Sequence, residues 1–220
     1  MAISLTVDIV VFTFEDSALK VLLVRRRNAP HRGRMALPGG FVKEKENLEH
    51  AALRELNEET GLRHVALEQL YSYGDPRRDP RGRVVSIAYL ALVAPGRPLR
   101  AGSDATEAAW QPLNKLPALA FDHRQMVRCA LKRLRSKLDY STAGFQLLPR
   151  KFSLPELQTL YETVLDRELD KRNFRKKMDL LGILKRLKEW RRTGRKPARL
   201  YSFIPKKFEK LKDKGILFPF

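Results

Sequence analysis

Three glutamates, Glu55, Glu58 and Glu59, are spaced so that they share one face of a predicted helix. The sequence predicts that this helix runs from about Asn47 to Glu59, with Asn47 as its N-cap and Gly61 just past its end. Carboxylate oxygens gathered on one helix face suit a hard divalent cation such as Mg²⁺ or Mn²⁺. Such a cation stabilises charge on a phosphate oxygen and readies a water for attack. The alternative is an ordinary solvated acidic face.

The residues around the glutamates are expected to position them. Arg54 lies next to Glu55 in the sequence and is expected to orient the carboxylates from outside the metal site. The opposite side of the predicted helix is apolar and is expected to pack on a core. Its residues are Leu48, Ala51, Ala52 and Leu56.

The whole stretch from residue 38 to 62, PGGFVKEKENLEHAALRELNEETGL, resembles the Nudix box at every fixed position. The resemblance implies a Nudix fold and a metal-dependent pyrophosphohydrolase site. It implies that Glu55 and Glu59 hold the metal and that the Gly40 carbonyl adds a ligand. Glu58 is expected to share a metal or to act as the base, and Arg54 to orient the glutamates.

The charge of the chain points beyond a small-molecule hydrolase. The 220 residues carry a net charge of +19, and 43% are hydrophobic, enough for packed cores. Residues 1–149 hold 23 Lys and Arg against 16 Asp and Glu, whereas residues 150–220 hold 21 against 9. A basic excess concentrated in the last third of the chain indicates a nucleic-acid partner.

Cysteine content and hydropathy favour a cytoplasmic protein. Cys129 is the only cysteine, which excludes an intramolecular disulfide, and it is expected to pack in a core. No apolar stretch is long enough to span a membrane, and the N-terminus has neither a basic region nor a cleavage site typical of a signal peptide. We therefore expect no membrane partner.

The first part of the chain alternates β-rich runs with helical segments, which predicts an α/β (α+β) fold in which helices sandwich a mixed sheet. Residues 96–108 are expected to form a mobile polar loop. A helix is predicted from about Asp122, its N-cap, to Leu138. Its apolar stripe is expected to pack in the core, and the alternative is a dimer interface. The expected strands are Ser4 to Phe14, Lys20 to Arg26, a short strand after residue 36, and residues 65–74 and 84–95.

An arginine-rich loop, residues 74–83, is a candidate phosphate clamp because the arginine fork matches phosphate oxygens. Position alone leaves an exposed charged hairpin loop equally open. The segments 67–90 and 104–123 look like the ADP-ribose-related branch of the Nudix superfamily. On that resemblance we expect ADP-ribose, or a related nucleotide, to be the ligand. Its candidate contacts are Arg78, Asp79, Arg81 and Glu107, with Arg83 as a further arginine of the loop.

Nudix hydrolases commonly recruit another carboxylate from outside the box as a base or an extra metal ligand. Asp104 and Glu107 are the candidates here, although a solvent-facing acid is the alternative for each. His123 follows the predicted N-cap Asp122 and is expected to be structural.

The basic end of the chain predicts a winged helix-turn-helix domain. Ser153 and Glu156 have capping-box spacing at the start of one helix, with Pro155 tolerated early in it. A basic helix follows from about Asp170, and residues 183–205 are typical of a β-hairpin with a basic tip. The alternative is a basic, solvated extension that docks in no groove.

In that geometry the second helix enters the major groove and the wing contacts phosphates. The candidate DNA-binding residues of the helix are Lys171, Arg172, Asn173, Arg175 and Lys176. Those of the wing are Arg192, Arg195 and Lys196.

Taken together, the Nudix box, the segment FSLPELQTLYETVLDRELDKRNFRKKM and the ending GILFPF resemble the Nudix-related transcriptional regulators of NAD metabolism. The resemblance implies a homodimer that binds a palindromic double-stranded DNA operator and is released by ADP-ribose. Many members have a degraded box, whereas this chain keeps every carboxylate. The predicted boundaries are 1–140 for the Nudix domain, 141–151 for a linker and 152–220 for the winged helix domain.

Two functions remain open, and they are compatible. One is a ligand-responsive DNA-binding repressor, favoured by the basic tail. The other is a Mg²⁺-dependent ADP-ribose or nucleoside diphosphate sugar pyrophosphatase with an accessory winged helix domain, favoured by the intact box.

Overall fold

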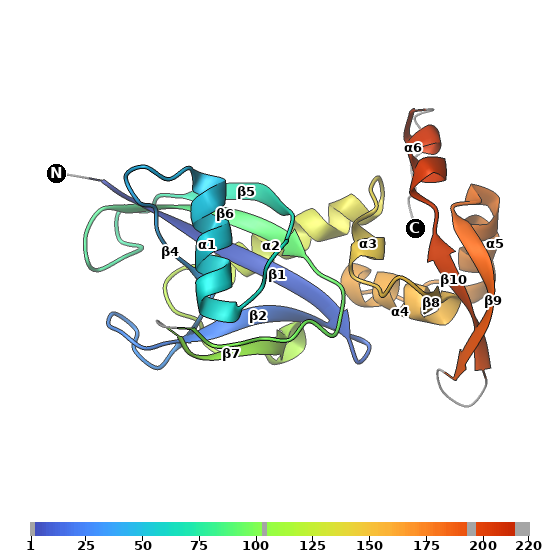
Figure 1. Ribbon diagram of the computed structural model, residues 1–220, viewed down its shortest axis with the longest axis horizontal. Helices are drawn as coiled ribbons and strands as arrows, with labels where there is room; N and C mark the ends of the chain where they lie inside the picture. The colour runs from blue at the N-terminus through green and yellow to red at the C-terminus, as the bar shows by residue number, and fades with distance from the viewer. Residues whose placement is uncertain (1–2, 103–104, 193–196, 214–220) are drawn as a thin grey trace. The chain divides into compact units, whose positions relative to one another are not determined.

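The computed structural model describes residues 3–102, 105–192 and 197–213 (Figure 1). The predicted wing residues Arg195 and Lys196, and the candidate carboxylate Asp104, lie outside these ranges. The chain divides into two compact units. The first comprises residues 1–13 and 20–132, and the second comprises residues 14–19 and 133–220.

The first unit is built on a mixed sheet, to which seven strands contribute within the described residues. The central order is β3-β2-β1-β6-β5, while β4 pairs with β1 and β7 pairs with β2. Strands β1 and β6 run parallel, and β5 and β6 antiparallel. The strands are β1 (Ser4–Glu15), β2 (Ala18–Arg26), β3 (Met35–Ala36), β4 (Gly39–Phe41), β5 (Leu67–Tyr73), β6 (Val84–Leu92) and β7 (Ala105–Pro112).

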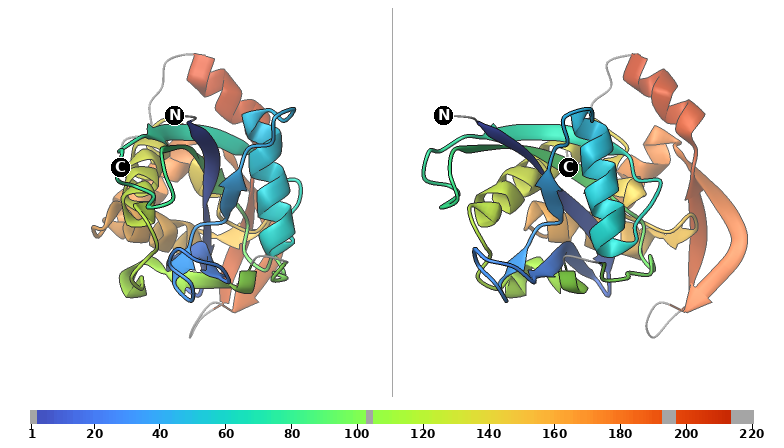
Figure 2. Two further views of the ribbon diagram at one scale, coloured as in Figure 1. Left: turned by 90° about the vertical axis from the view of Figure 1, so that its left-hand side faces the viewer. Right: turned by 60° about the vertical axis from the view of Figure 1, so that its left-hand side comes forward.

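Two helices cover this sheet on opposite faces, α1 (Leu48–Thr60) and the first half of α2 (His123–Leu138) (Figures 1 and 2). The apolar side of α1 packs on one face through Ala51, Ala52 and Leu56, which are fully buried against residues of β1, β2 and β6. A short 3₁₀ helix, η1 (Leu113–Lys115), follows β7. The predicted fold class and both helices are confirmed.

The segment from Gly96 to Ala108 differs from the prediction. We expected a mobile polar loop, but residues 105–108 belong to β7 and pair with β2, with Ala108 opposite Val24. The strand continues through Trp110, opposite Leu22, to Pro112, opposite Lys20. Strand β7 forms because it pairs with β2, which lies far away in the sequence. Its local composition therefore did not predict a strand.

The second unit is a helical core with a three-stranded sheet of order β8-β10-β9. The predicted capping box at Ser153 is present, and Asp170 caps the basic helix α5 by accepting a hydrogen bond from the Asn173 amide. The predicted winged helix pattern is therefore confirmed. Its elements are α3 (Ala143–Gln146), β8 (Phe152–Ser153), α4 (Leu154–Leu165), α5 (Lys171–Leu181), β9 (Leu184–Arg192), β10 (Pro197–Phe203) and α6 (Pro205–Asp213).

Part of the predicted linker belongs to the core of the second unit. Leu147 and Leu148 are buried, and the Phe145 ring stacks on Phe203 of β10 at 4.2 Å. Helix α6 was not predicted, and its Phe208 packs with Ile183 in the same apolar cluster. In the sequence these apolar residues are scattered among polar ones, so they gave no clear pattern. They become core residues only when the β9–β10 hairpin packs against them.

The structure also bears on the expected burial of Cys129 and on membrane-spanning helices. Cys129 is only partly buried, not fully packed in the core as expected. In the parts of the chain that the structure describes, no helix is long and apolar enough to cross a membrane.

Candidate functional site

A cleft of about 460 Å³ opens in the first unit where α1 faces β4 and the arginine-rich loop. All four box residues predicted to be catalytic, Arg54, Glu55, Glu58 and Glu59, border this cleft. Gly40, Arg78, Asp79 and Arg81 border it as well. The structure thus brings together most of the residues that the sequence singled out.

Helix α1 holds the glutamates because both of its ends are fixed as predicted. The Asn47 side chain accepts a hydrogen bond from the His50 amide, and Gly61 ends the helix in the left-handed conformation with φ 74°. Between these caps the glutamates differ in burial. Glu59 is buried, the Glu55 side chain is 15% exposed and that of Glu58 is 46% exposed.

Arg54 connects three carboxylates. Its guanidinium donates to Glu46 at 2.8 Å, to Glu55 at 2.6 Å and to Glu58 at 3.2 Å. The hydrogen bonds from Arg54 to Glu46 hold the pKa of Glu46 down at about 2. Burial raises the pKa of Glu55 above its ordinary value although Arg54 opposes the effect. The geometry agrees with the expected orienting role of Arg54.

Strand β4 needs its two glycines because it lies close against β1 and the Glu55 carboxylate. The Gly39 amide donates to Glu59 Oε2 at 2.9 Å. A side chain at Gly39 would collide with the backbone of Val7, and one at Gly40 would collide with the Glu55 carboxylate. The close approach keeps the Gly40 backbone beside the glutamates.

The donor set fits a hard divalent cation, since three carboxylates and the Gly40 backbone border one cleft. Within the described residues no three His, Cys, Asp or Glu side chains are already arranged around a metal position. Arg54 contacts both Glu55 and Glu58, and Glu59 is bonded to Gly39. Side-chain rotation of these glutamates would be part of metal binding.

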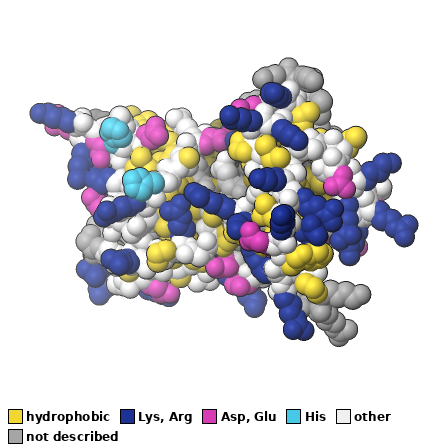
Figure 3. Space-filling view, turned by 45° about the vertical axis from the view of Figure 1, so that its right-hand side comes forward, with side chains coloured by type: hydrophobic (Ala, Val, Ile, Leu, Met, Phe, Trp, Pro, Cys, Tyr) yellow, Lys and Arg dark blue, Asp and Glu magenta, His cyan; other side chains and the backbone are white. Residues whose placement is uncertain are grey.

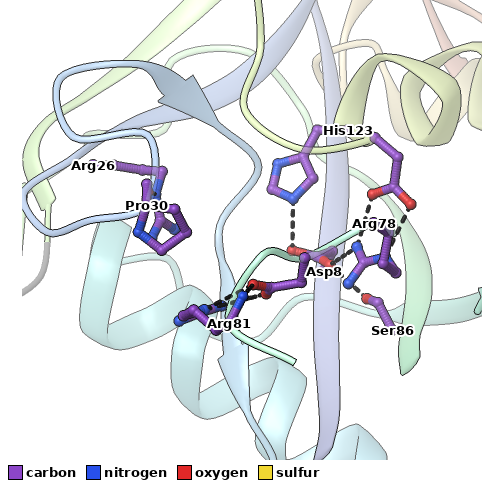
Figure 4. Close-up of polar contacts among 9 residues, drawn as sticks. Asp8, Arg26, Pro30, Arg78, Arg81, Ser86 and His123 are labelled. Atoms are coloured by element: carbon purple, nitrogen blue, oxygen red, sulfur yellow. Dashed lines mark hydrogen bonds and ion pairs between the residues drawn. The ribbon is translucent and has the colours of Figure 1, made fainter. Parts of the chain in front are cut away.

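Beside the glutamates lies a buried polar network (Figure 4). Asp8 of β1 accepts a hydrogen bond from Ser86 and lies 3.3 Å from His123 Nε2. His123 Nδ1 accepts from the Leu37 amide at 2.9 Å, which assigns the proton of the neutral ring to Nε2. Burial lowers the pKa of His123, so the ring is neutral at pH 7. The expected structural role of His123 agrees with these contacts.

The arginines of the loop divide into two roles. Arg78 is buried and donates to both oxygens of Asp122, at 2.9 and 2.7 Å, with Asp8 at 3.6 Å. Arg81 is partly exposed and pairs with the buried Asp79 at 2.6 Å. Burial favours protonation of Asp79, but the hydrogen bonds and charge of Arg81 bring the net pKa below its usual value. Arg81 is therefore the better placed of the two for a ligand phosphate.

Two predicted contacts lie elsewhere. Glu107 sits on β7 and pairs with Arg25 at 2.9 Å, and it is absent from the residues that line the cleft. Arg83 donates to the Gly74 carbonyl and is also absent from the lining. We expected Glu107 to reach the ligand from a mobile loop. It lies on strand β7 instead, where pairing with β2 fixes its position.

Other cleft residues were not predicted as site residues. They include Thr6 and Asp8 on β1, Arg26 on β2, and the aromatic rings of Phe41 and Phe121. One signal was present in the sequence, because Thr6 and Asp8 are alternate polar positions beside the apolar run of β1 and so share one face. Arg26, whose Nε donates to the Pro30 carbonyl, carried no comparable signal.

In the second unit, the predicted DNA-binding side chains of α5 form an exposed basic face. Phe174 and Met178 turn inward and are 2% exposed each. Lys and Arg side chains spread over the surface of this unit (Figure 3). The exposed predicted residues are Lys171, Arg172, Asn173, Arg175 and Lys176 on α5 and Arg192 at the end of β9.

The hairpin adds basic residues that were not predicted. Lys185, Arg186, Lys188 and Arg191 of β9 are exposed. Arg199 of β10 lies over the exposed ring of Trp190, 4.6 Å from its centroid, in a cross-strand pair. A helix and a β-ribbon that both present cations match the charge of a DNA backbone.

Two sequence families match this chain. The NUDIX domain family matches residues 3–129, and the NrtR DNA-binding winged helix domain family matches residues 144–203. The ADPR responsive transcriptional repressor NtrR of Acinetobacter baylyi is 36% identical over 203 residues, which cover 90% of this chain and 81% of the repressor. The chain belongs to the NrtR family.

Solved structures of an NrtR agree with this membership. Shewanella oneidensis NrtR in complex with a 27mer DNA is 37% identical, with a TM-score of 0.76 over 93% of this chain and 95% of that one. Its NUDIX domain in complex with ADP ribose is 41% identical, with a TM-score of 0.58 over 61% of this chain and 90% of that one.

The first unit of this NrtR family member also resembles an enzyme. An ADP-ribose pyrophosphatase of Methanocaldococcus jannaschii is 49% identical over 109 residues, which are 50% of this chain and 64% of that enzyme. Members of the Nudix hydrolase family generally use divalent metal ions.

Proposed function

We propose that this protein is a transcriptional repressor whose winged helix domain binds DNA and whose Nudix cleft binds ADP-ribose. One observation carries the proposal: a single chain joins a cleft lined by the box glutamates and by Arg54, Arg78 and Arg81 to an NrtR winged helix domain. The Acinetobacter relative is an ADPR responsive transcriptional repressor, and the Shewanella relative has been solved with DNA and with ADP ribose. Because ADP-ribose is a part of NAD, we further propose that the target genes serve NAD metabolism.

The proposal assigns DNA contacts to the exposed face of α5 and to the hairpin. Arg175 and Lys176 would neutralise backbone phosphates, and Asn173 can reach a base edge from the first turn of the helix. Arg186 and Arg191 extend the same charge along β9. Burial lowers the pKa of Lys177 on α5, although Asp139 opposes the effect, and we therefore assign Lys177 no DNA contact.

The experiment is a pair of binding measurements on the full chain. An operator is first selected from a pool of random duplexes, and its affinity is then measured by fluorescence anisotropy at several salt concentrations. We expect the affinity to fall steeply with salt, because phosphate contacts release counterions. Isothermal titration should show ADP-ribose binding to the same protein. A flat salt dependence or no ADP-ribose binding would contradict the proposal.

A second candidate function is favoured by the intact box. We propose that the cleft also hydrolyses ADP-ribose to AMP and ribose 5-phosphate. The support is the set of Glu55, Glu58 and Glu59 on one face of α1, with Arg54 bound to two of them. Similarity to the Methanocaldococcus pyrophosphatase points the same way.

For this reaction Glu55, Glu58, Glu59 and the Gly40 carbonyl would hold Mg²⁺ or Mn²⁺. A bound divalent ion would neutralise charge on the diphosphate and ready a water for attack. Arg54 keeps Glu55 and Glu58 in place, and Arg81, which borders the same cleft, can pair with a diphosphate oxygen. The buried Asp8–His123 pair fixes the Leu37 backbone, two residues before the Gly39 amide that holds Glu59.

Hydrolysis is tested by incubating the full chain with ADP-ribose and Mg²⁺ and measuring AMP by chromatography. Rapid production of AMP would make the protein a regulator that destroys its own signal. Tight binding of ADP-ribose without AMP would mean that the box serves as a sensor only.

We also propose a homodimer and revised domain boundaries. A palindromic operator requires two winged helices at a fixed spacing, which a two-fold dimer supplies. ADP-ribose would weaken DNA binding by changing that spacing. For the boundaries, we propose that the Nudix domain ends within α2, near residue 132 where the two compact units divide, and not near residue 140. We propose that the winged helix domain begins by residue 144, because Phe145 packs in its apolar cluster and residues 147 and 148 are buried.

A further inference from the structure

The cleft is also bordered by two aromatic rings to which the proposed metal and diphosphate contacts assign no role. Phe41, at the end of β4, is 43% exposed, and Phe121 precedes α2. Both rings border the cleft. The guanidinium of Arg81 lies 4.9 Å from the centroid of Phe41 and 5.8 Å from that of Phe121, within the range of a cation–π contact. One planar cation therefore faces two rings.

The backbone of Phe121 supports a role beyond packing. Its φ of 48° is in the left-handed region, which costs energy for a residue with a bulky side chain. The ring is also held by Arg26, 4.9 Å from its centroid, and by the edge of His31 at 4.7 Å. The fold thus tolerates strain to keep this ring at the cleft, where it is fixed before any ligand arrives.

An unpaired hydroxyl lies beside the aromatic site. Thr6 of β1 is directly opposite Phe41 of β4 in the antiparallel ladder, so the two side chains share one face. Thr6 is 7% exposed and borders the cleft, and its Oγ1 has no hydrogen-bond partner among the residues described. A buried hydroxyl without a hydrogen-bond partner lowers the stability of the fold, and a ligand that bonds to it would remove this cost. The threonine hydroxyl can either donate or accept that hydrogen bond.

We propose that Phe41, Phe121 and Thr6 form the subsite for the base of a nucleoside diphosphate ligand. The planar base replaces the Arg81 guanidinium against the rings, and its polar edge takes the hydrogen bond of Thr6. Arg81 is then free to pair with the diphosphate. This inference rests on the proposed nucleotide-binding function and adds which residues recognise the base.

The test compares ligands with and without a base on the full chain. ADP-ribose and ADP carry the base, whereas inorganic pyrophosphate carries only the diphosphate. For Phe41→Leu and Phe121→Leu we expect affinities for ADP-ribose and ADP to fall about 5- to 100-fold, as for loss of base stacking. Pyrophosphate affinity should stay within about twofold. Phe41→Tyr should retain nucleotide binding, and Tyr71→Leu, an exposed aromatic outside the cleft lining, is the matched control.

Thr6→Val separates recognition from folding. Removing an unpaired buried hydroxyl should leave the urea midpoint unchanged or raise it, while ADP-ribose affinity falls about 2- to 10-fold. The subsite is overturned if these variants bind ADP-ribose and ADP as the wild type does, if pyrophosphate binding falls equally, or if the wild type binds neither nucleotide. If the wild type binds ADP but not ADP-ribose and the variants lose ADP, the subsite stands and the proposed ligand fails.

Discussion

Arg78 donates hydrogen bonds to both carboxylate oxygens of Asp122, at 2.9 and 2.7 Å, and so ties the arginine-rich loop to the start of α2. The two side chains are only 4% and 12% exposed. The sequence predicted Arg78 as a phosphate clamp and Asp122 as a helix cap. In the structure Arg78 is the most buried arginine of the loop and pairs with Asp122, whereas Arg81, which borders the same cleft, is the more exposed of the two.

Loss of one partner of this buried ion pair should destabilise the protein strongly. Arg78→Gln leaves the carboxylates of Asp122 and Asp8 buried without their cation, which costs about 3–5 kcal/mol. Urea unfolding followed by circular dichroism measures the loss. Arg77→Gln is the matched control, because Arg77 is 94% exposed and should change the free energy of unfolding by less than about 0.5 kcal/mol. Equal effects of the two substitutions would contradict the assigned role of Arg78.

The buried His123 should make stability depend on pH. Burial holds its folded pKa below the ordinary value of about 6.5, so the unfolded chain binds the proton first as the pH falls. The stabilisation is complete above about pH 6.5 and is lost below it, by up to about 1.4 kcal/mol per pH unit. Asp8 and Asp122 oppose the shift, whereas Arg78 and Arg26 support it.

The measurement compares the free energy of unfolding at pH 7.5 and 5.5 for the wild type and for His123→Asn, which keeps an acceptor near the Leu37 amide. The wild type should lose about 1 kcal/mol more than the variant over this range. An identical loss in both proteins would place the titrating group elsewhere.

Substitution of the box glutamates should separate catalysis from DNA binding. Glu58→Gln and Glu59→Gln remove carboxylate ligands from the proposed metal site and should abolish ADP-ribose turnover. Arg54→Gln should lower turnover about 10- to 100-fold, because it only orients the ligands. Glu49→Gln, in the exposed first turn of the same helix, should have no effect. Affinity for the selected operator should be unchanged in all four variants, and its loss would mean that the box is mainly structural.

Charge substitutions on α5 should change the salt dependence of DNA binding. Arg175→Gln or Lys176→Gln each removes one proposed phosphate contact, so the log–log slope should fall by about 1. Lys115→Gln, an exposed lysine of the first unit, is the matched control. If the control lowers the slope as much as the α5 variants do, the binding is non-specific attraction to the whole charged surface.

The parts of the fold that were predicted correctly depend on short-range rules. The α1 caps at Asn47 and Gly61, the capping box at Ser153, and the register of the glutamates follow from spacing alone. The strand β7 was missed because its structure comes from pairing with β2. The same limit hid the buried network, since Asp8 and His123 meet only after β1 and the start of α2 have packed on each other.

The candidate site shows the same division. Glutamate positions were visible as a helical pattern, whereas the role of each arginine depends on its burial. Arg78 and Arg81 are three residues apart, yet one is fixed by Asp122 and the other by Asp79 beside two aromatic rings. Phe41 and Phe121, 80 residues apart in the sequence, could not be paired without the folded cleft.

The central claim is that ADP-ribose and DNA binding are coupled, and one measurement tests it most directly. The dissociation constant of the full chain for the selected operator is measured with no ligand and with saturating ADP-ribose, whose binding is confirmed by calorimetry. We predict at least about a fivefold loss of operator affinity, and operator DNA should weaken ADP-ribose binding by the same factor. An operator affinity that does not change at saturating ADP-ribose would contradict the account.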